Sequence, residues 1–121
     1  MKKLFISCPM RGRSNESILA SIEQMHKIAE AIFGEELEVV QTHVIMNEPP
    51  RNADERLWHL GNSIQKMATA DYFIGVYDAD KENDGCIIEN HVAKLYGVPR
   101  YLVDIKYIAP DVMEERDSLW K

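Results

Sequence analysis

Glu89 is the carboxylate of this 121-residue chain whose position best suits chemistry. It lies about one turn into a predicted helix that opens with Asp84, Gly85 and Cys86, directly after a polar loop. The first turn of a helix has unpaired backbone N–H groups, and a carboxylate beside them can act as a nucleophile or general base. Acidic residues also stabilise this end of the helix dipole, so the spacing alone leaves a purely structural role open.

A second candidate site is the segment that follows the first apolar run of the chain. Its proline and glycine favour a turn in which the backbone can approach a ligand closely. Arg11 carries a guanidinium group, which pairs with phosphate through two hydrogen bonds. An ordinary turn with a solvated arginine fits the same residues. The residues of this predicted ligand-binding loop are Ser7, Cys8, Pro9, Met10, Arg11 and Gly12.

The third candidate is the pair Asn62 and Ser63, which follows Gly61 inside a predicted helix. Glycine weakens a helix by about 1 kcal/mol relative to alanine, so its presence favours the close approach of another group. That group is either a ligand or a neighbouring helix. The remaining predicted ligand-binding residues flank the polar loop before Glu89 and are Asp78, Asp84, Gly85 and Cys86.

The two cysteines, Cys8 and Cys86, form neither a disulfide framework nor a metal-binding spacing. Free thiols are typical of a reducing compartment, which predicts a cytoplasmic protein. Cys86 lies at a helix N-terminus, where the pKa of a thiol can be lowered, but no base is placed beside it. The histidines are scattered along the chain. We therefore predict no thiol catalysis, no metal site and no cofactor.

Apolar periodicity and turn residues predict the elements that carry these candidates. Ile18, Ile22, Met25, Ala29 and Ile32 recur at helical spacing, between a capping Ser14 and a terminating Gly34. Leu57, Leu60, Ile64 and Met67 mark a second amphipathic helix. The predicted strands are 4–6, 37–40, 72–77 and 101–103, and the predicted helices are 15–33, 54–68, 85–96 and 110–121.

This alternation predicts an α/β fold of the flavodoxin or Rossmann type, with a parallel sheet of about four to five strands flanked by helices. We expect residues 1–121 to form a single domain. In such sheets, ligands bind outside the carboxyl ends of the strands. This rule selects three segments for the site: 7–14, 43–54 and 78–89.

Charge and hydropathy exclude several classes of partner. The formal net charge is −6, which disfavours binding to a nucleic-acid polymer, because such binding needs a basic surface. A single nucleotide needs only a few local donors and stays compatible with the sequence. The first apolar run is too short for a signal peptide, and no stretch approaches the ~20 apolar residues of a membrane span. We therefore expect neither secretion nor membrane attachment.

Three motifs in order resemble the nucleoside 2-deoxyribosyltransferase-like superfamily, and in particular a short bacterial and phage-borne branch of it. The first is the Ser-x-Pro-Met-x-Gly start at 7–12. The second is the Leu-Trp-x-Leu-Gly-x-Ser helix at 57–63, and the third is the Gly-Cys-x-Ile-Glu helix ending at Glu89. The resemblance also covers the strand around 70–76 and the Ala-x-x-x-Gly-x-Pro segment at 93–99. It spans roughly residues 3–103.

The resemblance implies a reaction. Glu89 would attack the anomeric carbon of a nucleoside or nucleoside 5′-monophosphate, and water or a second base would then take the sugar. Arg11 and Gly12 would hold the sugar-phosphate side, while Asn62 and Ser63 would contact the base or sugar. The resemblance also implies a homo-oligomer and no cofactor.

The chain departs from the superfamily at one position. Ser63 stands where the enzymes usually have an aspartate that helps to protonate the leaving base. Asp78, Asp80 or Asp84 could replace that acid. The alternative function is a protein of the same fold that binds a nucleotide or a nucleotide signal without turning it over.

Overall fold

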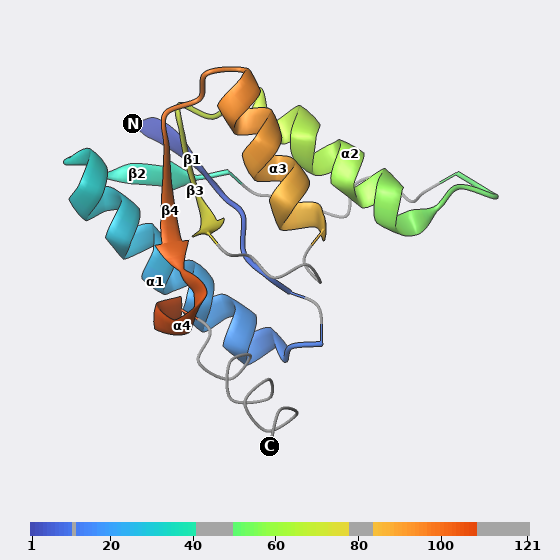
Figure 1. The fold of residues 1–121 in the computed structure, drawn as a ribbon, viewed down its shortest axis with the longest axis horizontal. Helices are drawn as coiled ribbons and strands as arrows, with labels where there is room; N and C mark the ends of the chain where they lie inside the picture. The colour runs from blue at the N-terminus through green and yellow to red at the C-terminus, as the bar shows by residue number, and fades with distance from the viewer. Residues whose placement is uncertain (11, 41–49, 78–83, 109–121) are drawn as a thin grey trace.

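The computed structural model describes residues 1–10, 12–40, 50–77 and 84–108, and strands alternate with helices along this part of the chain (Figure 1). Every strand and helix predicted between residues 4 and 96 is present, with bounds that differ from the prediction by no more than two residues. The elements are β1 Lys2–Ile6, α1 Asn15–Phe33, β2 Leu37–Val39, α2 Glu55–Met67, β3 Tyr72–Tyr77, α3 Asp84–Leu95, β4 Arg100–Asp104 and α4 Ile105–Ile108.

The strands form a four-stranded parallel sheet in the order β2-β1-β3-β4. Phe5 is in register with Phe73 in the central pair, and Val76 with Val103 in the next. The predicted parallel α/β sheet flanked by helices is therefore confirmed. The strand order is of the open type in which the chain leaves the two central strands toward opposite edges.

Local side-chain chemistry sets the helix boundaries. Ser14 caps α1, because its Oγ accepts a hydrogen bond of 3.1 Å from the backbone N–H of Ser17. Gly34 ends the same helix at φ 75°, in the left-handed region that glycine adopts without a steric penalty. Asp54 caps α2 in the same manner, through a bond of 3.0 Å from Leu57 N–H.

Two hydrophobic clusters pack on opposite faces of the sheet. Figure 1 shows α1 and α4 on one face, and α2 and α3 on the other. The first cluster joins Leu4, Ile6 and Ile74 to Met25 and Ala29 of α1. The second is smaller and consists of Phe5, Phe73, Met67 and Ala93. Successive strand residues serve the two clusters alternately, as a strand covered on both faces requires.

Some expectations from the periodicity were wrong. Ile32 and Leu57 were assigned to buried stripes, but their side chains are 49% and 68% exposed. Both lie in a terminal turn of their helix, Ile32 at the end of α1 and Leu57 at the start of α2. The short helix α4 was not predicted, since four residues are too few for a periodic pattern. The predicted helix at 110–121 lies outside the described residues.

None of the helices in residues 12–40, 50–77 and 84–108 combines the length and the apolar composition that a membrane span requires.

Candidate functional site

The candidate site lies where the chain order of the sheet reverses. β1 connects through α1 to β2 on one side, whereas β3 connects through α3 to β4 on the other. The segments that leave β1 and β3 therefore diverge at the carboxyl edge, where this fold class binds its ligands. Ser7 continues the β1–β3 ladder into this edge, because its backbone N–H donates to Ile74 O at 2.8 Å.

Glu89 reaches this edge from α3 and meets Ser7. The Ser7 hydroxyl donates a hydrogen bond of 2.8 Å to Glu89 Oε1 and joins residues that are 82 positions apart. Burial raises the pKa of Glu89 from 4.5 to about 7, and the bond from Ser7 lowers it by a smaller amount. Glu89 therefore changes its charge near neutral pH. Perturbed carboxylates of this kind concentrate at functional sites.

Cys86 lies one turn before Glu89 and adjoins the same serine. Its pKa is raised to about 12, chiefly by burial, although a hydrogen bond with the Ser7 side chain acts in the opposite direction. A helix N-terminus can lower the pKa of a thiol, but at Cys86 desolvation outweighs the helix field. Cys8 is also buried, on the α1 face of the sheet, where its side chain belongs to the larger hydrophobic cluster. Both thiols are thus part of the protein interior.

Arg13 anchors the loop after β1, and sequence analysis did not identify it. Its Nη1 donates to Pro9 O at 2.8 Å, and its Nη2 donates to Ser17 Oγ at 2.7 Å and Ser21 Oγ at 2.6 Å. Ser17 and Ser21 lie four residues apart on one face of α1, and Arg13 precedes this helix by two residues, so the sequence contains a signal for the contact. Gly12, at φ 73°, supplies the turn before this anchor.

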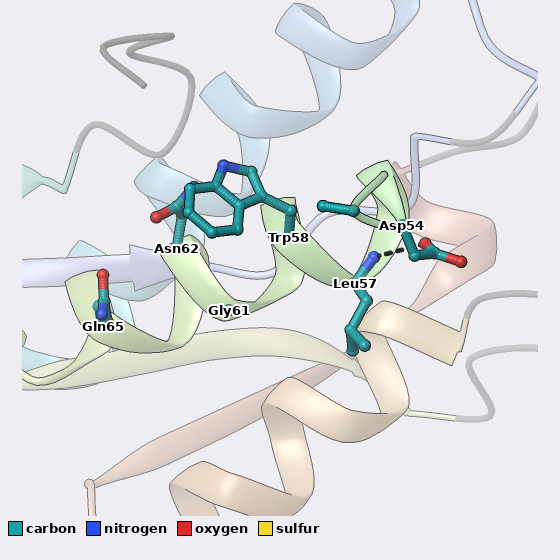
Figure 2. Close-up of a pocket in the computed structure, with 7 residues that line it drawn as sticks. Asp54, Leu57, Trp58, Gly61, Asn62 and Gln65 are labelled. Atoms are coloured by element: carbon teal, nitrogen blue, oxygen red, sulfur yellow. Dashed lines mark hydrogen bonds between the residues drawn. The ribbon is translucent and has the colours of Figure 1, made fainter. Parts of the chain in front are cut away.

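A hollow of about 490 Å³ lies along α2. Figure 2 shows Trp58 and Asn62 projecting from the same side of this helix, with Gly61 and Gln65 along the hollow. Ser63 is half-buried and is not part of the lining. Neighbouring helical residues point about 100° apart, so Asn62 and Ser63 face different surroundings. A Cβ at Gly61 would meet no atom within 4 Å, so this glycine is not required by packing among the described residues.

Other predicted residues are placed around the ends of α2 and α3. Asp84 is exposed, and its Oδ2 lies 3.9 Å from Arg56 Nη2, across the N-terminal ends of the two helices. Gly85 is half-buried, and its Cβ position is open. Pro9 is buried and Met10 half-buried in the loop after β1. Arg11 and Asp78 lie outside the described residues, as does most of the predicted 43–54 segment.

Tyr77 and Asp104 form a further polar pair at the carboxyl edge, which sequence analysis also missed. They end adjacent strands, and Tyr77 Oη donates to Asp104 Oδ2 at 3.1 Å. A hydrogen bond from the backbone N–H of Lys106 is the main reason why the pKa of Asp104 is lowered. Cross-strand register creates this pair, and register cannot be read from either strand alone. In the described residues, no three His, Cys, Asp or Glu side chains cluster as metal ligands would.

Comparisons with known proteins support the fold. No protein-family model matches the chain, and no curated protein matches it in sequence. A solved structure of a 2-deoxyribosyltransferase from the psychrotolerant bacterium Bacillus psychrosaccharolyticus matches it in three dimensions, with a TM-score of 0.56 and 16% sequence identity. The match covers 85% of this chain and 72% of that enzyme. The chain therefore shares the Rossmann-like α/β fold of that transferase.

Proposed function

We propose that this protein cleaves or exchanges the N-glycosidic bond of a nucleoside or nucleoside 5′-monophosphate, with Glu89 as the nucleophile. The observation that carries the proposal is the hydrogen-bonded contact of Glu89 with Ser7 at the carboxyl edge of the sheet. Two further findings support it. The fold is that of a 2-deoxyribosyltransferase, and the order of the three sequence motifs resembles the superfamily of that enzyme.

The reaction has two steps. A carboxylate oxygen of Glu89 forms a bond to C1′ as the C1′–N bond breaks, and the electron pair of that bond leaves with the base, which takes a proton. The product is a glycosyl ester of Glu89. The nitrogen of a second base, or water, then attacks C1′ and releases the carboxylate, with loss of a proton. The transition states resemble an oxocarbenium ion, as in retaining glycosidases.

The ionisation of Glu89 sets the pH dependence of this reaction. Only the carboxylate form can attack C1′, and the pKa of Glu89 is raised to about 7 by burial. The value of kcat/KM therefore increases about tenfold per pH unit below neutrality and levels off above it. An ordinary exposed glutamate would place this change near pH 4.

The assignments of the remaining residues follow from the superfamily resemblance. Arg11 and Gly12 bind the sugar-phosphate side of the substrate, and Asn62 and Ser63 contact the base or sugar. Because Ser63 cannot supply a proton as an aspartate would, departure of the base relies on another acid or on water. We expect turnover to be slow for this reason, since general acid catalysis contributes about 10²–10⁴-fold to rates.

Release of free base from nucleosides tests the proposal. The intact protein is incubated with a panel of deoxynucleosides, ribonucleosides and their 5′-monophosphates, and free base is measured by chromatography. Glu89→Gln keeps the shape of the side chain and removes its charge, so we expect at least a 10³-fold loss of base release, as for other knocked-out covalent nucleophiles. The mass of the intact protein during turnover should also reveal the glycosyl ester.

The matched control is Glu23→Gln. Glu23 is an exposed residue of α1 that pairs with Lys27 at 3.3 Å, so its loss should leave base release unchanged. Base release that survives Glu89→Gln would refute the nucleophile assignment. If no substrate is turned over and nucleotides nevertheless raise Tm, the alternative function, nucleotide binding without turnover, is supported.

A further inference from the structure

Ser7 is one of two buried polar residues in the described part of the chain, and its surroundings differ from those of a ligand-binding serine. Ser7 is only 2% exposed. The hydroxyl has a single hydrogen, and that hydrogen is directed to Glu89 Oε1 at 2.8 Å. A substrate would therefore have to displace Glu89 in order to receive it.

The backbone holds Ser7 in one place. Its N–H donates to Ile74 O at 2.8 Å, which extends the parallel ladder between β1 and β3 by one residue. Leu4 and Ile6 of β1 face the α1 side of the sheet, whereas Phe5 faces the α3 side. Alternation along the strand then turns Ser7 toward α3 and Glu89. Only χ1 remains to place its Oγ, so the donor is well defined.

The two carboxylate oxygens of Glu89 differ in their hydrogen bonding. Oε1 accepts the bond from Ser7, whereas Oε2 has no hydrogen-bond partner among residues 1–10, 12–40, 50–77 and 84–108. A hydrogen bond to one oxygen restricts the rotation of a carboxylate and leaves the other oxygen available to react. Such preorganisation accelerates reactions because the reacting atoms need no reorientation.

We infer that Ser7 is the positioning residue of Glu89, whose hydroxyl holds Oε1 so that Oε2 is the atom that attacks C1′. This inference rests on the proposed function for the identity of the attacked carbon, but the coupling between the two side chains can be measured without any substrate. It reassigns Ser7 from a predicted ligand contact to a residue that acts through Glu89.

Titratable groups near Glu89 lie on α3 and in the loop after β1. Cys86 on α3 lies next to the Ser7 side chain, and both Glu89 and Cys8, in the loop after β1, raise its pKa. Arg13 Nη1 donates a hydrogen bond of 3.8 Å to Cys8 Sγ. Burial and the Ser7 bond are the causes that act on Glu89 itself. Removing the hydroxyl thus removes the contribution that favours the ionised form.

The test compares Ser7→Ala with Ser21→Ala in the full chain. Ser21 is the matched control, because it is also 2% exposed, its hydroxyl donates to the backbone oxygen of Ile108, and α1 covers the face of the sheet opposite to α3 (Figure 1). The pKa of Glu89 is measured by NMR titration of protein with ¹³C-labelled glutamate carboxyl groups. We expect Ser7→Ala to raise that pKa by about one unit, as the loss of one charge-assisted bond predicts, and Ser21→Ala to leave it unchanged.

Turnover and thermal unfolding give second readouts. In an active enzyme, Ser7→Ala should lower kcat at least tenfold with little change in KM. The acidic limb of the profile of kcat/KM against pH should also shift to higher pH by about one unit, in parallel with the pKa of Glu89. Should Ser7→Ala unfold too readily for NMR, Tm between pH 5 and 9 measures the same coupling. Ser7→Ala should then steepen the loss of Tm with pH, and should have no such effect in a Glu89→Gln background.

Two outcomes would overturn the inference: an unchanged pKa of Glu89 in Ser7→Ala, or an equal shift in Ser21→Ala. A protein that shifts as expected but releases no base from any nucleoside supports the coupling and contradicts only the proposed function. The two failures can therefore be told apart.

Discussion

At the residue scale, the burial of Glu89 has a cost that depends on pH. Folding raises the pKa of Glu89 from 4.5 to about 7. Between these two pH values, Glu89 is protonated in the native protein and ionised in the unfolded chain. Stability is therefore lost as pH increases through this window, and it is regained below it. The same burial that brings the pKa of Glu89 close to neutral pH therefore lowers the stability of the protein when Glu89 ionises.

Glu89→Gln should remove this cost. A neutral amide does not ionise, so the variant gains up to roughly 3 kcal/mol of unfolding free energy over the wild type at pH 8.5 to 9, and little at pH 5. Urea unfolding at several pH values measures the difference. Glu23→Gln, at an exposed position, should show no pH-dependent gain. A gain from Glu89→Gln that is equal at pH 5 and pH 9 would contradict the raised pKa.

Cys86 should be unreactive in the folded protein. Its pKa of about 12 leaves a thiolate fraction at pH 8 about 10³-fold below that of an ordinary thiol, and burial limits access further. We expect reaction with a disulfide reagent to be slower by at least this factor than in denaturant, where both thiols react. Peptide mass analysis identifies the modified cysteine, and rapid modification of Cys86 would disprove this expectation.

At the element scale, the two glycines Gly61 and Gly75 have opposite packing environments. A Cβ on Gly75 in β3 would lie 2.8 Å from Phe73 Cε1. Phe73 is fully buried and stacks on Phe5 with ring centroids 5.7 Å apart, so it has little room to move. The Cβ position of Gly61 in α2 is open. The strand therefore requires its glycine, whereas the packing of the described helix does not.

Alanine substitutions should show this contrast. Gly75→Ala should destabilise the protein by about 1–3 kcal/mol through overpacking. Gly61→Ala should stabilise it by about 0.5–1 kcal/mol, because alanine favours the helix. Chemical denaturation of both variants measures these changes. If Gly61→Ala is destabilising instead, something that the described residues do not include packs on the hollow beside Trp58.

At the scale of the whole molecule, strand order creates the candidate site. Placing β1 beside β3 brings Ser7 to Glu89 across 82 residues of chain, and the same order places Tyr77 next to Asp104 at one edge. Large apolar side chains stay exposed on the single chain, including Leu57 at 68% and Tyr96 at 82%. Isolated exposed apolar residues are common in monomers, so this exposure alone does not establish an interface.

The homo-oligomer stays a prediction that follows from the superfamily resemblance. We expect sedimentation equilibrium to give a mass of at least twice the 13.9 kDa of the chain, independent of salt if apolar contacts hold the subunits together. A mass of one chain across the micromolar range would contradict this prediction. It would leave the assignment of Glu89 untouched, because Ser7 and Glu89 belong to the same chain.

The sequence by itself determined every described element except the short helix α4, with bounds within two residues. Ser14, Gly34 and Asp54 act on backbone groups within one turn, so the limits of α1 and the start of α2 could be read from the residues alone. The alternation of strands and helices in turn required a parallel sheet. The place of Glu89 near the start of a helix made it a candidate, and the resemblance of three motifs in order implied its role as nucleophile.

Tertiary structure alone decided how the site is connected. The bond between Ser7 and Glu89 depends on strand order, and the pair of Tyr77 and Asp104 depends on strand register. The raised pKa of Cys86 has the same origin, since the burial that raises it arises only when separate elements pack together. Local interactions act within one turn of the chain, whereas burial and register are set only when separate elements pack together.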